Sequence, residues 1–167
     1  MYLRSGVFTR RPETYSLMPE TSRDHDAVAR QLGREPRPFR VAARCPFGLP
    51  SVIENERTRE MPTSFWATCP SLVVAISRVE STGGVREARE EVGETTIEEV
   101  HDEHRSRYGT RVAGVRDAAT GSVKCLHAFT ALHISRAIPN PVAEWTLGRI
   151  ENPYPEDRCC TAEDAND

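Results

Sequence analysis

The stretch Gly121-Ser-Val-Lys-Cys-Leu-His-Ala-Phe129 opens the most apolar helix that the sequence predicts, and we expect this helix to continue to about Ala137. It contains Lys124, the only lysine of the chain, beside 21 arginines. An amine can be needed where a guanidinium does not serve, for instance as a compact charge against a phosphate. The stretch also contains Cys125 and His127, whose side chains bind transition metals. The rest of the chain is therefore interpreted around this helix.

Three short strands are predicted upstream of it. Residues 39–45 alternate, with Phe39, Val41, Ala43 and Cys45 apolar and Arg40 and Arg44 polar, which is typical of a half-buried strand. Residues 51–55 and 64–69 form the second and third strands, and turn residues separate the first two. We expect a small antiparallel sheet that brings Cys45 and Cys69, each at a strand end, toward one another.

Helices are predicted at residues 24–33, 71–80, 85–92 and 95–108. The last begins with Thr95-Thr-Ile-Glu98, the pattern of a capping box. Its apolar face includes His101 and His104 at helical spacing. The predicted fold class is therefore α+β, with an antiparallel sheet of about three strands packed by four or five helices.

The length of 167 residues suits one domain. We expect this domain at residues 22–150, a disordered extension at 1–21 with translation starting at Met1 or Met18, and a disordered acidic tail at 151–167. The net charge of −3 argues against a nucleic-acid surface. No apolar run reaches the ~20 residues of a membrane span, so we expect a cytoplasmic protein.

The first functional hypothesis is a metal site formed by Cys45, Cys69, Cys125 and His127, with His101 as a further candidate ligand. Three thiolates and one imidazole suit zinc or another soft metal. The segment Cys45-Pro-Phe-Gly48 is similar to half of a zinc knuckle. In a regular helix Cys125 and His127 would point about 200° apart. They can share a metal only if the helix begins at or after Cys125.

Other hypotheses use the same residues differently. Buried cysteines also pack as small hydrophobic side chains. A thiol-dependent enzyme would use Cys125 as nucleophile and His127, His101 or His104 as base, with Lys124 lowering the thiol pKa. An anion site would combine the cations Lys124, Arg34, Arg37 and Arg78.

Several strings of the sequence together strongly resemble an uncharacterised bacterial family, the domain of unknown function 501. They are Ala27–Arg34, Val41–Pro46, Thr68–Pro70, Ser77-Arg-Val-Glu80, Val123–Ala128 and Asn140-Pro141. The resemblance implies soluble proteins of high-GC bacteria, often encoded near a septum-formation initiator and an exopolyphosphatase, with no assigned activity.

The resemblance also implies two features of the site. In some relatives a histidine stands at the position of Cys69, an exchange that suits a metal ligand. Relatives usually carry a second histidine at the position of Leu132, whereas this chain has His133 one residue later.

The sequence therefore predicts a cytoplasmic protein of an unknown-function family, with a Cys/His site for zinc or another soft metal. The alternatives are a thiol-dependent enzyme using Cys125, and a non-catalytic interaction protein in a cell-division or polyphosphate-related context.

Overall fold

A computed structural model describes residues 21–56, 63–114 and 119–155. Its sheet has three antiparallel strands in the order β1 (Phe39–Arg44), β2 (Pro50–Asn55) and β3 (Phe65–Ala67). The described residues also form six α-helices: α1 (Ser22–Leu32), α2 (Pro70–Ser81), α3 (Gly84–Val92), α4 (Glu94–Tyr108), α5 (Leu126–Ile134) and α6 (Pro141–Leu147), with a 3-10 turn, η1, at Val112–Gly114. The predicted α+β class and three-stranded sheet are confirmed. The described residues form six helices, one more than the four or five that were predicted.

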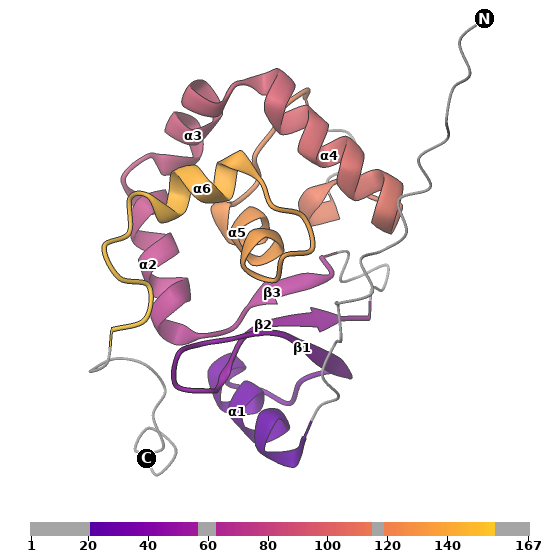
Figure 1. Cartoon of the computed structure of the whole chain (residues 1–167), viewed down its shortest axis with the longest axis vertical. Coiled ribbons are helices and arrows are strands. Elements are labelled where there is room, and N and C mark those ends of the chain that lie inside the picture. Colours follow the sequence, from indigo (N-terminus) through magenta and orange to yellow (C-terminus); the bar gives the residue numbers. More distant parts are fainter. Residues whose placement is uncertain (1–20, 57–62, 115–118, 156–167) are drawn as a thin grey trace, which may run out of the picture.

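The sheet is covered on both faces. α1 lies against one face, where Val28 packs with Phe39, Val41 and Ile53 in a small apolar cluster. The remaining helices lie on the opposite side (Figure 1), where Val52 and Phe65 belong to the main core. Successive residues of β2, such as Val52 and Ile53, therefore pack into different apolar clusters, because successive side chains of a strand point to opposite faces of the sheet.

The end of β1 departs from the predicted alternation. The β1–β2 register shifts between Val41 and Ala43 and again between Ala43 and Arg44. A bulge of this kind exchanges the faces toward which later side chains point. Phe39 and Val41 consequently pack toward α1, whereas Cys45 belongs to the main core on the other side. The prediction that Cys45 shares a face with Phe39 and Val41 is wrong for this reason.

The bulge also turns Arg44 toward α1. Its guanidinium donates two hydrogen bonds, of 2.7 and 2.9 Å, to the carboxylate of Asp24, a residue that is only 3% exposed. These hydrogen bonds are the main reason that the pKa of Asp24 lies below its ordinary value. The ion pair fixes α1 to the sheet.

α4 begins differently from the sequence prediction. Gly93 precedes its first turn, with a backbone φ of 88°, and the predicted capping box at Thr95 is wrong. The carboxylate of Glu98 instead binds both terminal nitrogens of Arg111, which is 8% exposed, and accepts the N–H of Gly121 at 2.8 Å. Glu98 therefore joins α4 to the loop that leads into α5.

α5 occupies the centre of the helical layer and is seen nearly end-on in Figure 1. Six of its nine residues are buried, including Leu126, Phe129 and Leu132. The central position of this helix follows from its apolar composition, since a helix that is apolar on most sides needs partners on most sides.

The ends of the chain were predicted to lie outside the domain. Residues 1–20 of the extension, residues 156–167 of the tail, and Cys159 and Cys160 lie outside the described residues. Residues 151, 152 and 155 line a groove against α2. The described residues contain no helix with the length and apolar character needed to span a membrane.

Candidate metal centre

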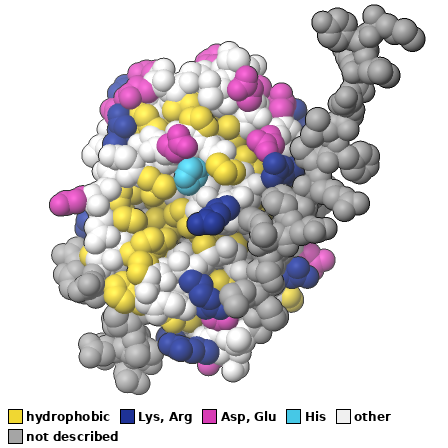
Figure 2. Space-filling model, viewed as in Figure 1, with side chains coloured by type: hydrophobic (Ala, Val, Ile, Leu, Met, Phe, Trp, Pro, Cys, Tyr) yellow, Lys and Arg dark blue, Asp and Glu magenta, His cyan; other side chains and the backbone are white. Residues whose placement is uncertain are grey.

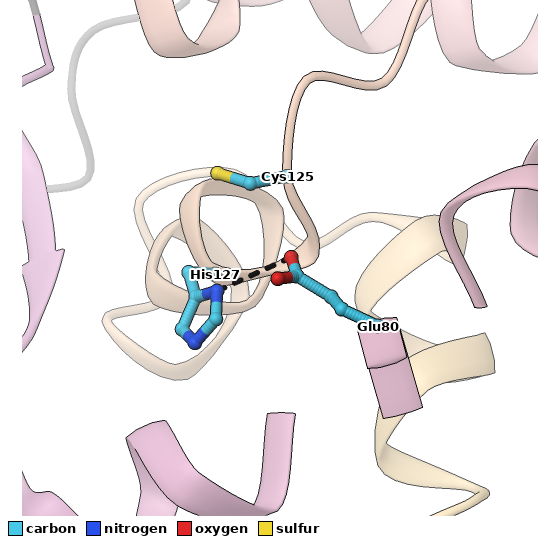
Figure 3. A group of neighbouring side chains, drawn as sticks. All are labelled: Glu80, Cys125 and His127. Atoms are coloured by element: carbon cyan, nitrogen blue, oxygen red, sulfur yellow. Dashed lines mark hydrogen bonds and ion pairs between the residues drawn. The ribbon is translucent and has the colours of Figure 1, made fainter. Parts of the chain in front are cut away.

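Three potential metal ligands meet where α2 ends and α5 begins. Glu80, Cys125 and His127 each offer a ligand atom, and these atoms all lie within 4.8 Å of one another. Figure 3 shows the carboxylate of Glu80 and the ring of His127 pointing toward each other, with Cys125 on the segment that leads into α5. All three side chains are half-buried, so the group is sheltered but open to solvent.

The beginning of α5 decides whether Cys125 and His127 can act together. Cys125 has extended backbone angles, φ −156° and ψ 151°, and the helix begins at Leu126. The condition set from the sequence, a helix that begins at or after Cys125, is therefore met. The first helical N–H, that of Leu126, donates to Oε1 of Glu80 at 2.6 Å. Glu80 thus caps a helix to which it does not belong.

The ring of His127 is held between two acceptors. Its Nδ1 is 3.2 Å from Oε1 of Glu80, and its Nε2 is 3.2 Å from the backbone oxygen of Val73. A carboxylate and a carbonyl oxygen only accept hydrogen bonds, and a neutral imidazole has a single N–H. Both contacts are satisfied together only if the ring carries a second proton or if a metal ion lies between Nδ1 and Glu80.

The second of these arrangements is common at metal sites. A ligating histidine usually donates its other ring N–H to a backbone carbonyl or a carboxylate, which fixes the tautomer and the orientation of the ring. Val73 of α2 is placed for this role. The available ligand nitrogen would then be Nδ1, on the side of Glu80.

The thiol of Cys125 is held in its protonated form. Burial raises the pKa of the Cys125 thiol, and the negative charge of Glu80 raises it further. The backbone of Ala128 and His127 and the charge of Lys124 act in the opposite direction but do not cancel the rise. A metal ion would have to displace this proton, because the thiolate is the ligand form of cysteine.

Cys45 and Cys69 lie in the main core, where they are 4% and 0% exposed. Both thiols are reduced, as is that of Cys125. Their backbone N–H groups donate to Leu49 and Ser51, at the beginning of β2, so both cysteines lie at the same end of the sheet. Among the described residues, neither belongs to the group formed by Glu80, Cys125 and His127.

His101 has partners on both ring nitrogens. Nε2 lies 2.7 Å from the backbone oxygen of Ser122, and Nδ1 accepts the N–H of Val112 at 3.2 Å. Burial lowers the pKa of His101. The neutral His101 ring therefore joins the loop before α5 and the turn η1 to α4 through its two hydrogen bonds.

The four cations of the predicted anion site lie on different elements. Arg34 follows α1 and stacks on Trp66, with its guanidinium carbon 5.8 Å from the ring centre. Arg37 precedes β1 and is exposed, and Arg78 lies on α2 in the groove. Lys124 is exposed beside Cys125. The anion site stays a prediction.

Sequence reasoning did not identify Glu80 or Ser77 as functional residues. Both lie in the string Ser77-Arg-Val-Glu80, which carries part of the family resemblance, and the fold places this string against the string Val123–Ala128. The three-residue spacing puts Ser77 and Glu80 on neighbouring positions of one helix face. Only their distance from His127 reveals their relation to it.

Comparisons with known proteins agree with the resemblance. A family model described as "Protein of unknown function (DUF501)" matches residues 41–111, a segment that includes Ser77 and Glu80 and ends before Cys125. No curated protein and no solved structure shows a significant match to the chain. The resemblance recognised from the sequence is thereby confirmed over residues 41–111, which match the domain of unknown function 501 family.

Proposed function

We propose that this protein binds a divalent transition metal, zinc before others, through Glu80, Cys125 and His127. The observation that carries the proposal is the approach of Nδ1 of His127 to Oε1 of Glu80 at 3.2 Å, beside a thiol of the same group. Two ligand atoms about 2.0–2.1 Å from a tetrahedral zinc ion are about 3.3 Å apart. The nitrogen and the oxygen therefore have the separation that a shared metal requires.

The donor set indicates which metals fit. One thiolate and one imidazole favour zinc, cobalt or iron over magnesium and calcium, which prefer oxygen ligands. Three protein ligands leave a fourth position for water, as in catalytic rather than structural zinc sites. Such a metal lowers the pKa of its bound water to about 7 and polarises carbonyl or phosphoryl oxygens.

The test is metal analysis of protein purified without a metal-binding tag. We expect about one metal ion per chain, and a cobalt-substituted form with the charge-transfer absorption of a cobalt–thiolate bond. The variants Glu80→Gln, Cys125→Ser and His127→Gln should each lose most of the metal while keeping the helical circular dichroism spectrum.

The ligand set predicted from the sequence supplies the matched controls. Cys45→Ala and Cys69→Ala keep the metal if Glu80, Cys125 and His127 form the site. They lose it if Cys45 and Cys69 are ligands, as the sequence alone predicts. A wild-type protein that binds neither zinc nor cobalt would contradict both assignments.

The thiol-dependent enzyme is less well supported. A nucleophilic cysteine needs a lowered pKa, whereas burial and Glu80 raise the pKa of Cys125. In the absence of metal we therefore expect Cys125 to react slowly with iodoacetamide. Rapid alkylation at neutral pH would favour the thiol enzyme.

A non-catalytic interaction protein is the remaining alternative, and the groove beside α2 is the feature that favours it. The groove encloses about 910 Å³ between α2 and the segment after α6. Its lining includes Val74, which is 48% exposed. Figure 2 shows hydrophobic side chains gathered over the region of α2, α5 and α6 in this view. A protein partner is expected for this alternative, whereas a cytoplasmic location is proposed for all three.

A further inference from the structure

The ring of His127 has a third neighbour that the metal proposal does not use. Oγ of Ser77 lies 3.2 Å from Nε2, while Nδ1 on the other side of the ring lies 3.2 Å from Oε1 of Glu80. The order is therefore hydroxyl, Nε2, Nδ1 and carboxylate. A nucleophile within reach of a base, with that base oriented by a third group, is the arrangement that activates a serine.

We propose that Ser77, His127 and Glu80 form a base-activated serine for acyl transfer, which operates when no metal occupies Nδ1. Ser77 is the nucleophile, His127 is the general base, and Glu80 positions the ring. The serine assignment stands on the geometry of these three residues. Only its control by metal rests on the proposed metal site.

The two acceptors beside the His127 ring, Glu80 and Val73, explain how Ser77 can be activated without metal and inactive with metal. Without metal, the charged carboxylate of Glu80 is a stronger acceptor than the carbonyl of Val73. The ring proton therefore lies on Nδ1, and Nε2 is left to accept the hydroxyl proton of Ser77. With metal on Nδ1, the proton moves to Nε2 and donates to Val73. Nε2 then no longer accepts, and Ser77 is not activated.

The position of Ser77 on α2 suits a substrate. Its side chain is exposed, and Val74 and Arg78, which line the groove, lie three residues before it and one after it. Residues three apart on a helix surface are neighbours. The apolar side chain of Val74 beside the hydroxyl fits an ester with an apolar acyl group.

The reaction balances without a cofactor. Oγ of Ser77 forms a bond to the ester carbonyl carbon as its proton passes to Nε2, and the carbon–alkoxy bond breaks. Nε2 returns the proton to the leaving alkoxide, which departs as an alcohol. Water then attacks the acyl-serine by the same proton path and releases the acid.

The test is labelling of the full chain by a fluorophosphonate, followed by mass spectrometry of the modified peptide. In this reaction Oγ bonds to phosphorus and fluoride leaves. We expect Ser77 to be labelled in protein treated with a chelator. Ser81, an exposed serine on the same helix whose hydroxyl donates to the backbone oxygen of Arg78, serves as the internal control and should stay unmodified.

Three variants show whether Ser77 is labelled because His127 and Glu80 activate it or only because its side chain is exposed. Ser77→Ala should abolish the label. His127→Gln should slow it by at least about 100-fold, the usual contribution of a general base. Glu80→Gln should also slow it, because the neutral amide oxygen that replaces Oε1 still accepts the N–H of Leu126 but is a weaker acceptor than a carboxylate and holds the ring proton on Nδ1 less firmly.

The outcomes distinguish this inference from the proposed function. Labelling of Ser77 no faster than Ser81, or at the wild-type rate in folded His127→Gln or Glu80→Gln, overturns the activated serine. Competition with cobalt shows whether zinc binds. Bound zinc should suppress the labelling of Ser77. If zinc binds and the labelling rate does not change, the proposal that metal regulates Ser77 is overturned. Labelling of Ser77 in a protein that binds no metal supports the serine and contradicts only the proposed metal site.

Discussion

The carboxylate of Glu80, near the end of α2, accepts the first backbone N–H of α5 from Leu126 at 2.6 Å. One side chain therefore both caps the central helix and orients His127, through the same oxygen. The start of the helix and the geometry of the candidate site consequently depend on one another.

This dual role predicts a difference between two substitutions of Glu80. Glu80→Ala leaves the N–H of Leu126 without its acceptor and should lower the free energy of unfolding by about 1–3 kcal/mol. Glu80→Gln keeps an accepting oxygen and should cost less than about 1 kcal/mol. Urea unfolding of metal-free protein measures both. Equal losses would mean that the charge, and not the hydrogen bond, stabilises this end of the helix.

Metal affinity should rise with pH. Because burial raises the pKa of Cys125 above its ordinary value, the thiol is protonated at neutral pH and must lose its proton to bind metal. About one proton should leave for each ion bound, so the affinity should increase about tenfold per pH unit between about pH 6.5 and 8. Calorimetric titration in buffers of different ionisation enthalpy counts the proton. An affinity independent of pH would show that Cys125 is not a ligand.

His101 should make the fold less stable in mild acid. Burial lowers its pKa in the folded protein, whereas in the unfolded chain it has the ordinary value of about 6.5. The unfolded state therefore binds more protons, and stability present above about pH 6.5 is lost as the pH falls toward the folded-state pKa.

Two measurements check this expectation. His101→Gln should be less stable at neutral pH by about 1–3 kcal/mol, because it weakens the contacts with Ser122 and Val112. It should also show a smaller loss of stability between pH 7 and 5 than the wild-type protein. Proton NMR of the His101 ring should show it neutral below pH 6.5. If the His101 ring titrates at its ordinary pKa, it is not the buried neutral ring that joins Ser122 and Val112 to α4.

Gly121 should be irreplaceable, and Gly33 provides its matched control. Both have left-handed backbone angles, φ 64° at Gly121 and 65° at Gly33. A Cβ at Gly121 would lie 2.5 Å from Cα of Glu94, whereas a Cβ at Gly33 would have no neighbour within 4 Å. Gly33→Ala should cost about 1–2 kcal/mol for the backbone conformation alone. Gly121→Ala should cost clearly more in urea unfolding and should weaken metal binding, since the loop before Cys125 must move. Equal costs would mean that this loop shifts freely.

Local sequence patterns determined most of the secondary structure of this protein. The alternation of residues 39–45, the helical spacing of Ile97, Val100, His101 and His104, and the apolar run after Cys125 predicted β1, α4 and α5. These features depend on neighbours within a few residues, which a period of two or 3.6 captures. The sequence also contained the strings that identify the family and singled out Cys125 and His127.

The tertiary structure decided what these residues contact. Two register shifts in β1 sent Cys45 into the main core and Arg44 toward Asp24. Glu98 binds Arg111 rather than capping its own helix. Glu80 and Ser77 reach His127 only because α2 packs beside α5. A periodic pattern shows which face of an element is buried, but the packing of elements distant in the chain selects the side chain that completes a site.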